Sequence, residues 1–198
     1  MIALHYPLYK HLFITYGKIG SSTLAGLPSP NISYDKKISV LEDFTNNNFL
    51  DHEIVLMLRN PRDRFRAGLF TTLFFEGGIR NKTMEEWVDI LTEYLSNTGM
   101  FNANPTSWEQ YHCMPWLQNI ETFVDSIRYT PVHISRLSDY LADHGIEPKH
   151  ENNTDRYNEK SIFYNAYSIA IKQFQKEYNL LLAQDLKLYN LWLTGEYV

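Results

Sequence analysis

The chain has 198 residues, of which 44% are hydrophobic and 15% aromatic, and its formal net charge is -5. This composition excludes a disordered chain and favours a packed globular protein, expected as one domain over residues 1–198. The negative charge argues against a dedicated nucleic-acid binder, so any anion site must be local.

Cysteine and histidine usage indicates neither a disulfide nor a metal centre. Cys113 is the only cysteine, which excludes an internal disulfide and a cysteine-based zinc site. The seven histidines show no H-E-x-x-H or similar spacing, so no metal site is expected. Since no apolar run is long enough to span a bilayer and the first residues lack the features of a signal peptide, we expect a soluble, cytoplasmic protein without a membrane partner.

The first elements along the chain are two strands and a helix between them. Residues 12–15 are an apolar run that predicts a short buried strand, and a helix is expected to open at Ser22 or Thr23. The Pro, Asn and Ser content of residues 27–37 predicts a loop. Residues 53–59 are a continuous apolar run ending in Arg, which is typical of a central parallel strand covered on both faces.

Two helices with clear start signals follow. Asn60 is a good N-cap, Pro61 suits the first helical position, and Asp63 complements the helix dipole. Thr83 and Glu86 have the spacing of a capping box at the start of the second helix. One face of that helix is apolar and consists of Met84, Trp87, Val88, Leu91, Tyr94 and Leu95.

The C-terminal part alternates in the same way. A long irregular stretch at residues 96–116 precedes a predicted strand at 130–135 and a short helix that should end at Gly145. A helical pattern then covers residues 162–191, with Phe163, Ala166, Ala170 and Phe174 on one stripe. Together these elements predict an α/β fold with a central, mainly parallel sheet and helices on both faces.

Polar residues gather where the first predicted strand ends. Gly17 and Gly20 allow the backbone to approach a ligand closely, Lys18 adds a positive charge, and residues 21–23 add three hydroxyl groups. A strand, a glycine-rich turn and a helix N-terminus together form a typical phosphate site, although an ordinary turn with a Ser or Thr N-cap explains the stretch equally well. The Walker A pattern does not match, because Lys18 precedes Gly20 and the hydroxyl residues instead of following the glycines.

Arginines follow the second predicted strand. Arg59 ends an apolar strand at the edge where open α/β sheets bind ligands, so an anionic partner is expected for it. Arg64 is open to two interpretations, an anion contact or a pair with Asp63 or another acid. Arg62 and Arg66 share one helix face and are better explained as charges of a solvated first turn. If the two strands are neighbours, Lys18 and Arg59 lie at one edge of the sheet.

These two junctions together resemble the sulfotransferases that use 3′-phosphoadenosine 5′-phosphosulfate (PAPS). The segment GKIGSSTL, residues 17–24, is similar to their 5′-phosphosulfate loop, and LRNPRDRFRAG, residues 58–68, to their 3′-phosphate segment. Three weaker similarities follow in order: YHCMPWLQ to a segment of the sugar 2-O-sulfotransferase branch, HENNT to an Asn-containing loop, and LLAQDLKLYN to a closing helix. The resemblance implies a P-loop-like three-layer sandwich and direct in-line transfer of a sulfuryl group to a hydroxyl, most naturally of a carbohydrate.

The resemblance also implies residue roles. The cofactor would be bound by Lys18, Gly20, Ser21, Ser22, Thr23, Leu24, Arg59 and Arg64, with Lys18 also catalytic and Arg59 at the 3′-phosphate. His112 is the candidate general base, with Glu76 and Glu109 as rivals, because His or Glu suits that role near neutral pH. His133 alternates with apolar residues in a predicted strand and is expected to be structural.

The chain departs from the family pattern at two positions. Gly17 replaces the usual Pro before the lysine, and Ala67 replaces the usual Ser that contacts the 3′-phosphate. The loss at Ala67 keeps a second hypothesis open, namely a nucleotide-binding protein of the same fold without activity. A magnesium-dependent P-loop kinase of small molecules is a more distant third.

Overall fold

The computed structural model of the chain describes residues 2–6, 9–15, 51–97, 101, 113, 115–125, 127–146 and 158–194. The chain divides into two compact units. Unit 1 comprises residues 1–59, 116–152 and 187–198, and unit 2 comprises residues 60–115 and 153–186. Each unit combines segments that are distant in the sequence, and the expectation of one domain over residues 1–198 stays a prediction.

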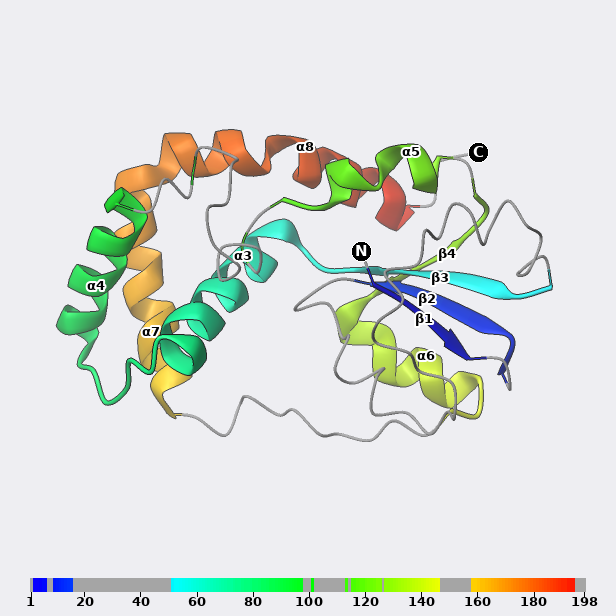
Figure 1. Cartoon of the computed structure of the whole chain (residues 1–198), viewed down its shortest axis with the longest axis horizontal. Coiled ribbons are helices and arrows are strands. Elements are labelled where there is room, and N and C mark those ends of the chain that lie inside the picture. The colour runs from blue at the N-terminus through cyan, green and yellow to red at the C-terminus, as the bar shows by residue number, and fades with distance from the viewer. Residues whose placement is uncertain are drawn as a thin grey trace. The chain divides into compact units, whose positions relative to one another are not determined.

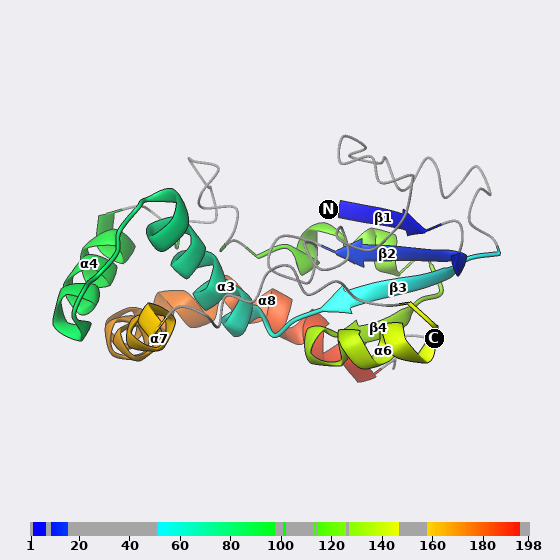
Figure 2. The same cartoon turned by 90° about the horizontal axis from the view of Figure 1, so that it is seen from below.

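Within the described residues of unit 1, four strands form one sheet in the order β1-β2-β3-β4 (Figure 1). The strands are β1 (Ile2–Tyr6), β2 (His11–Thr15), β3 (Glu53–Leu58) and β4 (Thr130–His133). β2, β3 and β4 are parallel to one another, and β1 pairs with β2 in the antiparallel sense, as Figure 2 shows. The predicted α/β class with a mainly parallel sheet is therefore confirmed, and β1 is an addition that the sequence did not predict.

The register of the parallel strands follows the two apolar runs. Leu12 lies opposite Ile54 and Ile14 opposite Leu56, so the predicted neighbours are paired. β2 is buried along its whole length, as is β3 after its first residue, because helices cover both faces of the sheet. Pro131 lies in β4, where the missing N–H is tolerated because β4 is an edge strand of the described sheet.

Short helices of unit 1 cover the sheet. A 3-10 turn (Leu117–Asn119) and α5 (Glu121–Val124) lie on one face with the last turns of α8, and a 3-10 turn (Ile134–Arg136) and α6 (Leu137–Asp143) lie on the other (Figures 1 and 2). The core of unit 1 joins the strands to side chains of these helices, and its members from the helices include Leu117, Val124, Leu137, Leu141, Leu188 and Trp192. Gly145, with φ of +69°, follows α6, as predicted.

Unit 2 is helical in its described part. It contains α3 (Pro61–Phe70), a π-helical turn (Thr71–Glu76), α4 (Met84–Asn97), α7 (Asn158–Ala170), a 3-10 turn (Ile171–Phe174) and most of α8 (Gln175–Thr194). Its core is rich in aromatic side chains and includes Phe65, Phe70, Phe74, Trp87 and Phe163. Several of these rings meet edge to face, for example Trp87 and Phe163 with centroids 5.0 Å apart.

The predicted starts of α3 and α4 are confirmed, whereas the helix start predicted at Ser22 or Thr23 lies outside the described residues. The Asn60 side chain accepts a hydrogen bond from the backbone N–H of Arg62 at 2.9 Å, which caps α3. Thr83 and Glu86 form the capping box of α4: the Thr83 N–H donates to the Glu86 carboxylate at 2.8 Å, and the Glu86 N–H donates to the Thr83 hydroxyl at 3.2 Å. Among the described helices, none has the length and apolar character required to cross a membrane.

Candidate functional site

The predicted 5′-phosphosulfate loop, residues 17–24, lies wholly outside the described residues. This applies to Lys18, Gly20, Ser21, Ser22, Thr23 and Leu24, and also to the candidate bases His112 and Glu109. Their roles therefore stay predictions. The other rival base, Glu76, is exposed at the end of the π-helical turn, and its role also stays a prediction.

The strands that lead into the two predicted cofactor segments are described. Because β2 and β3 are parallel neighbours, their carboxyl ends, Thr15 and Leu58, lie at the same edge of the sheet. In the sequence, the glycine-rich segment begins two residues after Thr15, at Gly17, and Arg59 follows Leu58 directly. β3 ends at Leu58, which is 0% exposed, and the partly buried Arg59 follows it directly, so Arg59 lies at this edge one residue beyond the end of the strand. In open α/β sheets this edge is where ligands bind.

The arginines of α3 differ in their surroundings. The Arg62 guanidinium is exposed and donates to the Asn179 side chain at 3.2 Å. The Arg66 guanidinium pairs with Asp63 at 2.9 Å and lies 4.1 Å above the centre of the Tyr164 ring. These contacts give Arg62 and Arg66 structural partners within unit 2, which agrees with the interpretation favoured from the sequence.

Arg64 is unusual among these arginines because its side chain is 2% exposed. Burial of a guanidinium is unfavourable without acceptors that compensate for the lost water. Asp63, the partner that one interpretation offered to Arg64, forms its ion pair with Arg66. An assignment of Arg64 to the cofactor stays a prediction.

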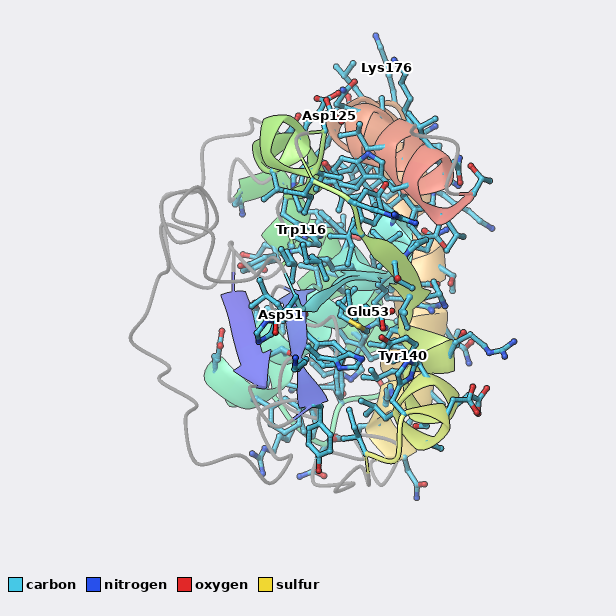
Figure 3. All side chains as sticks on the ribbon, turned by 90° about the vertical axis from the view of Figure 1, so that its right-hand side faces the viewer. Asp51, Glu53, Trp116, Asp125, Tyr140 and Lys176 are labelled. Atoms are coloured by element: carbon cyan, nitrogen blue, oxygen red, sulfur yellow. The ribbon has the colours of Figure 1, made fainter. Side chains whose placement is uncertain are left out.

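The opposite end of the same strands carries a second polar cluster, which the structure describes in full. His11 and Glu53 are the first residues of β2 and β3 and lie directly opposite each other in the register. Tyr140, on α6, and His144, directly after it, complete the cluster from the helix that covers this face. Figure 3 shows Glu53 and Tyr140 near each other at this end of unit 1. We call His11, Glu53, Tyr140 and His144 the amino-end cluster.

The distances in the amino-end cluster are short. His11 Nε2 lies 3.5 Å from Glu53 Oε2, and His144 Nε2 lies 3.6 Å from the same oxygen. The Tyr140 hydroxyl is 3.0 Å from His11 Nε2. The His11 and His144 rings meet edge to face with centroids 4.9 Å apart. One carboxylate oxygen therefore faces two imidazole nitrogens.

Backbone carbonyl groups fix the tautomers of both histidines. His11 Nδ1 lies 2.5 Å from the Tyr9 carbonyl oxygen, and His144 Nδ1 lies 2.7 Å from the Tyr140 carbonyl oxygen. Because a carbonyl oxygen can only accept, each Nδ1 carries a hydrogen and donates it. In the neutral rings the Nε2 lone pairs are therefore the ones that face Glu53.

The Tyr140 hydroxyl remains protonated in this setting. Burial raises the pKa of Tyr140 well above its ordinary value, and the negative charge of Glu53 with its hydrogen bond to the hydroxyl raises that pKa further. A protonated hydroxyl is a hydrogen-bond donor, so Tyr140 has two acceptors within reach, the Glu53 carboxylate and the His11 Nε2 lone pair.

The local backbone explains why His11 and Glu53 meet. The Glu53 N–H donates to the Lys10 carbonyl at 2.8 Å, which extends the pairing of β2 and β3 by one residue. Lys10 adopts φ of +52°, a left-handed conformation in the turn before β2. Its ammonium group forms a 2.8 Å ion pair with Asp51, and their hydrogen bond raises the pKa of Lys10 and lowers the pKa of Asp51. The backbone hydrogen bond of Glu53 and the Lys10–Asp51 ion pair thus hold the starts of β2 and β3 together.

The amino-end cluster was not predicted from the sequence, because metal-site motifs such as H-E-x-x-H have short spacings and this cluster does not. His11, Glu53 and His144 come from three distant positions, and only the parallel pairing and the return of α6 bring them together. A partial signal was present, since a polar residue opens each of the two apolar strands. The third partner, His144, carried no signal of its own.

Polar or charged residues therefore occur at both ends of the buried strands β2 and β3. The carboxyl edge leads into the predicted cofactor segments, and the amino edge carries the cluster of His11, Glu53, Tyr140 and His144. Comparison of the chain with family models, with curated proteins and with solved structures found no match to any of them.

Proposed function

We propose that the chain is a sulfotransferase that moves a sulfuryl group from PAPS to a hydroxyl group, with a carbohydrate as the favoured acceptor. The observation that carries this proposal is the parallel pairing of β2 and β3. The two segments that resemble the family's cofactor motifs come at the carboxyl ends of these strands in the sequence, and these two strand ends lie at one edge of one sheet.

The residue types fit the anion that they would bind. The hydroxyl groups and the ammonium group of residues 17–24, together with the helix start that the sequence predicts there, suit the 5′-phosphosulfate. The Arg59 guanidinium suits the 3′-phosphate dianion, because its planar fork can donate two parallel hydrogen bonds. These positive groups make a magnesium ion unnecessary for charge balance, in contrast to a P-loop kinase.

The cofactor supplies an activated sulfuryl group. In the proposed step the acceptor hydroxyl oxygen bonds to sulfur, the bond from sulfur to the bridging phosphate oxygen breaks, and adenosine 3′,5′-bisphosphate leaves with the electron pair. Lys18 would stabilise the negative charge on that bridging oxygen. A base, His112 or otherwise Glu76 or Glu109, would take the acceptor proton.

The direct test is turnover of PAPS with a panel of hydroxyl acceptors, measured as release of adenosine 3′,5′-bisphosphate. Lys18→Ala should lower kcat by about a hundredfold to a thousandfold, as removal of one group that stabilises an oxyanion does. Lys176→Ala is a matched control, because Lys176 is an exposed lysine on α8, and it should leave the rate unchanged. His112→Ala should lower kcat by about a hundredfold to ten-thousandfold and leave the affinity for adenosine 3′,5′-bisphosphate nearly unchanged.

Melting temperatures separate the competing functions. Adenosine 3′,5′-bisphosphate should raise the melting temperature without any metal if the proposal is right. Stabilisation without turnover on any acceptor would instead favour an inactive nucleotide-binding protein, the hypothesis that Ala67 keeps open. Stabilisation by Mg-ATP alone would favour a kinase, and no stabilisation by either nucleotide would refute the proposal.

A further inference from the structure

We propose that His11, Glu53 and His144 form a binding site for a divalent transition-metal ion, with Zn²⁺ as the ion that best fits these ligands. Two imidazole nitrogens and one carboxylate oxygen are a ligand set that zinc uses in proteins. All three residues belong to unit 1 and are among its described residues. The inference does not depend on the proposed sulfotransferase activity.

The spacing of the ligand atoms matches a small tetrahedral ion. Bonds of about 2.0–2.2 Å at tetrahedral angles place two ligand atoms about 3.3–3.6 Å apart. The two distances from Glu53 Oε2 to the imidazole nitrogens are 3.5 Å and 3.6 Å. The three ligand atoms lie within 4.8 Å of one another, so a movement of at most about 1.3 Å by the partly exposed His144 ring would bring the third pair to the same spacing.

The hydrogen bonds around the ligands orient them for a metal. Metal-binding histidines almost always donate their second N–H to a carbonyl or carboxylate, which fixes the tautomer and the ring plane. His11 and His144 both do so, through Nδ1 to the carbonyl groups of Tyr9 and Tyr140. When the ion binds His11 Nε2, the Tyr140 hydroxyl loses that acceptor and keeps its other one, the Glu53 carboxylate.

The three ligands of this site differ in their exposure to solvent. The His11 side chain is 7% exposed, whereas those of Glu53 and His144 are 36% and 32% exposed. A buried ligand at the base and partly exposed ligands at the surface provide an entry path for the ion. Three protein ligands also leave a fourth position for water, the arrangement of zinc sites that are not fully closed.

The position of this site separates it from the predicted cofactor edge. β2 begins at His11 and ends at Thr15, so the two ends are about 13 Å apart at the rise of an extended strand. An ion at the amino end would tie the starts of β2 and β3 to the end of α6. A metal bound there should therefore stabilise unit 1 whether or not PAPS binds.

The test uses the full chain after removal of metal with a chelator. Zn²⁺ is added in competition with a chromogenic chelator, and Co²⁺, which absorbs visible light strongly when four-coordinate, reports the geometry. Wild type should bind one ion at this site, and its melting temperature should rise with Zn²⁺ but not with Mg²⁺, which prefers oxygen ligands. Glu53→Gln and His144→Ala should each weaken Zn²⁺ binding by more than about a hundredfold, above the loss typical of an outer hydrogen bond.

Three further variants make the result decisive. His144→Asn keeps a side-chain N–H for the Tyr140 carbonyl but removes the ligand nitrogen, so it should fold and still lose the ion. Tyr140→Phe should weaken binding only about tenfold, as removal of an outer partner does. His133→Ala removes a histidine at the end of β4 and should leave binding unchanged.

The same titrations define the contrary results. No binding of Zn²⁺ by wild type, or equal binding by wild type, Glu53→Gln and His144→Asn, would overturn the proposal. The amino-end cluster would then be a hydrogen-bonded His–Tyr–Glu network whose role is to hold α6 on the sheet.

Discussion

Replacement of Arg59 by Ala separates recognition of a 3′-phosphate from general attraction of anions. Arg59 follows β3 at the carboxyl edge of the sheet, directly after Leu58, which is fully buried. Arg59 itself is only partly buried, so the truncation should not open a cavity in the core. We therefore expect the main effect on ligand binding.

The expected size follows from the hydrogen bonds that the guanidinium would make. A hydrogen bond to a charged group contributes about 1.5–3 kcal/mol, so the loss of one such bond weakens binding by about tenfold to a hundredfold. A fork that donates both bonds reaches the upper end of this range or exceeds it. Adenosine 5′-phosphate lacks the 3′ group, and its affinity should change by less than about threefold.

The assay is titration calorimetry with adenosine 3′,5′-bisphosphate and adenosine 5′-phosphate on wild type, Arg59→Ala and Arg59→Lys. Arg59→Lys keeps the charge but not the fork and should give an intermediate loss. Arg136→Ala is the matched control, because Arg136 is an exposed arginine of unit 1 that pairs with Asp139 at 3.0 Å. Equal losses for both nucleotides in Arg59→Ala would show that Arg59 does not recognise the 3′-phosphate.

Three further predictions concern stability. Thr83→Ala removes the hydroxyl that caps α4 and faces Glu86, so chemical denaturation should show a loss of about 0.5–2 kcal/mol, and a loss below that range would mean that the cap is not needed. Leu56→Ala empties a fully buried position in β3 and should lower the free energy of unfolding by about 2–5 kcal/mol, whereas Leu180→Ala, at a position 78% exposed on α8, should change it by less than about 0.5 kcal/mol. Burial raises the pKa of Tyr167 above that of an unfolded tyrosine, so its contribution to stability is complete below about pH 10 and is lost as pH rises further. The free energies of unfolding of wild type and Tyr167→Phe, plotted against pH, should therefore run parallel below about pH 10, and above it the wild type should lose stability relative to the variant.

Elements with strong local signals could be predicted from the sequence. The apolar run of β3, the Asn60 cap of α3 and the capping box of α4 all depend on neighbouring residues, and the structure confirms each one. The pairing of β2 with β3 was also predicted correctly, because both are continuous apolar runs of strand length, which is typical of central strands in a parallel sheet.

Elements without local signals were missed. β1 joins β2 through a turn in which Lys10 adopts a positive φ, a conformation for which Gly or Asn would have been the usual signal. Residues 162–191 were predicted as one helical pattern, whereas a short 3-10 turn at Ile171–Phe174 separates α7 from α8 without any Pro or Gly to mark it.

The two candidate sites also differ in whether their residues are contiguous in the sequence. The cofactor motifs are contiguous and could be found from the sequence, although only Arg59 and Arg64 of their proposed contacts lie in the described residues. The amino-end cluster depends on the register of two strands and the return of a helix, so His11, Glu53 and His144 had no shared pattern to find.

The path of the chain through unit 1 sets the time at which this unit can be completed during synthesis. Trp192 is fully buried in the same core as β2 and β3, although the whole of unit 2 lies between it and those strands in the sequence. At roughly 5–20 residues per second, a ribosome takes about 7–27 s to proceed from Leu58 to Trp192. During that interval the core of unit 1 lacks Leu188, Tyr189 and Trp192. A nascent chain that stops at Leu186 should therefore need a chaperone to stay unaggregated, even though the strands of unit 1 have already been synthesised.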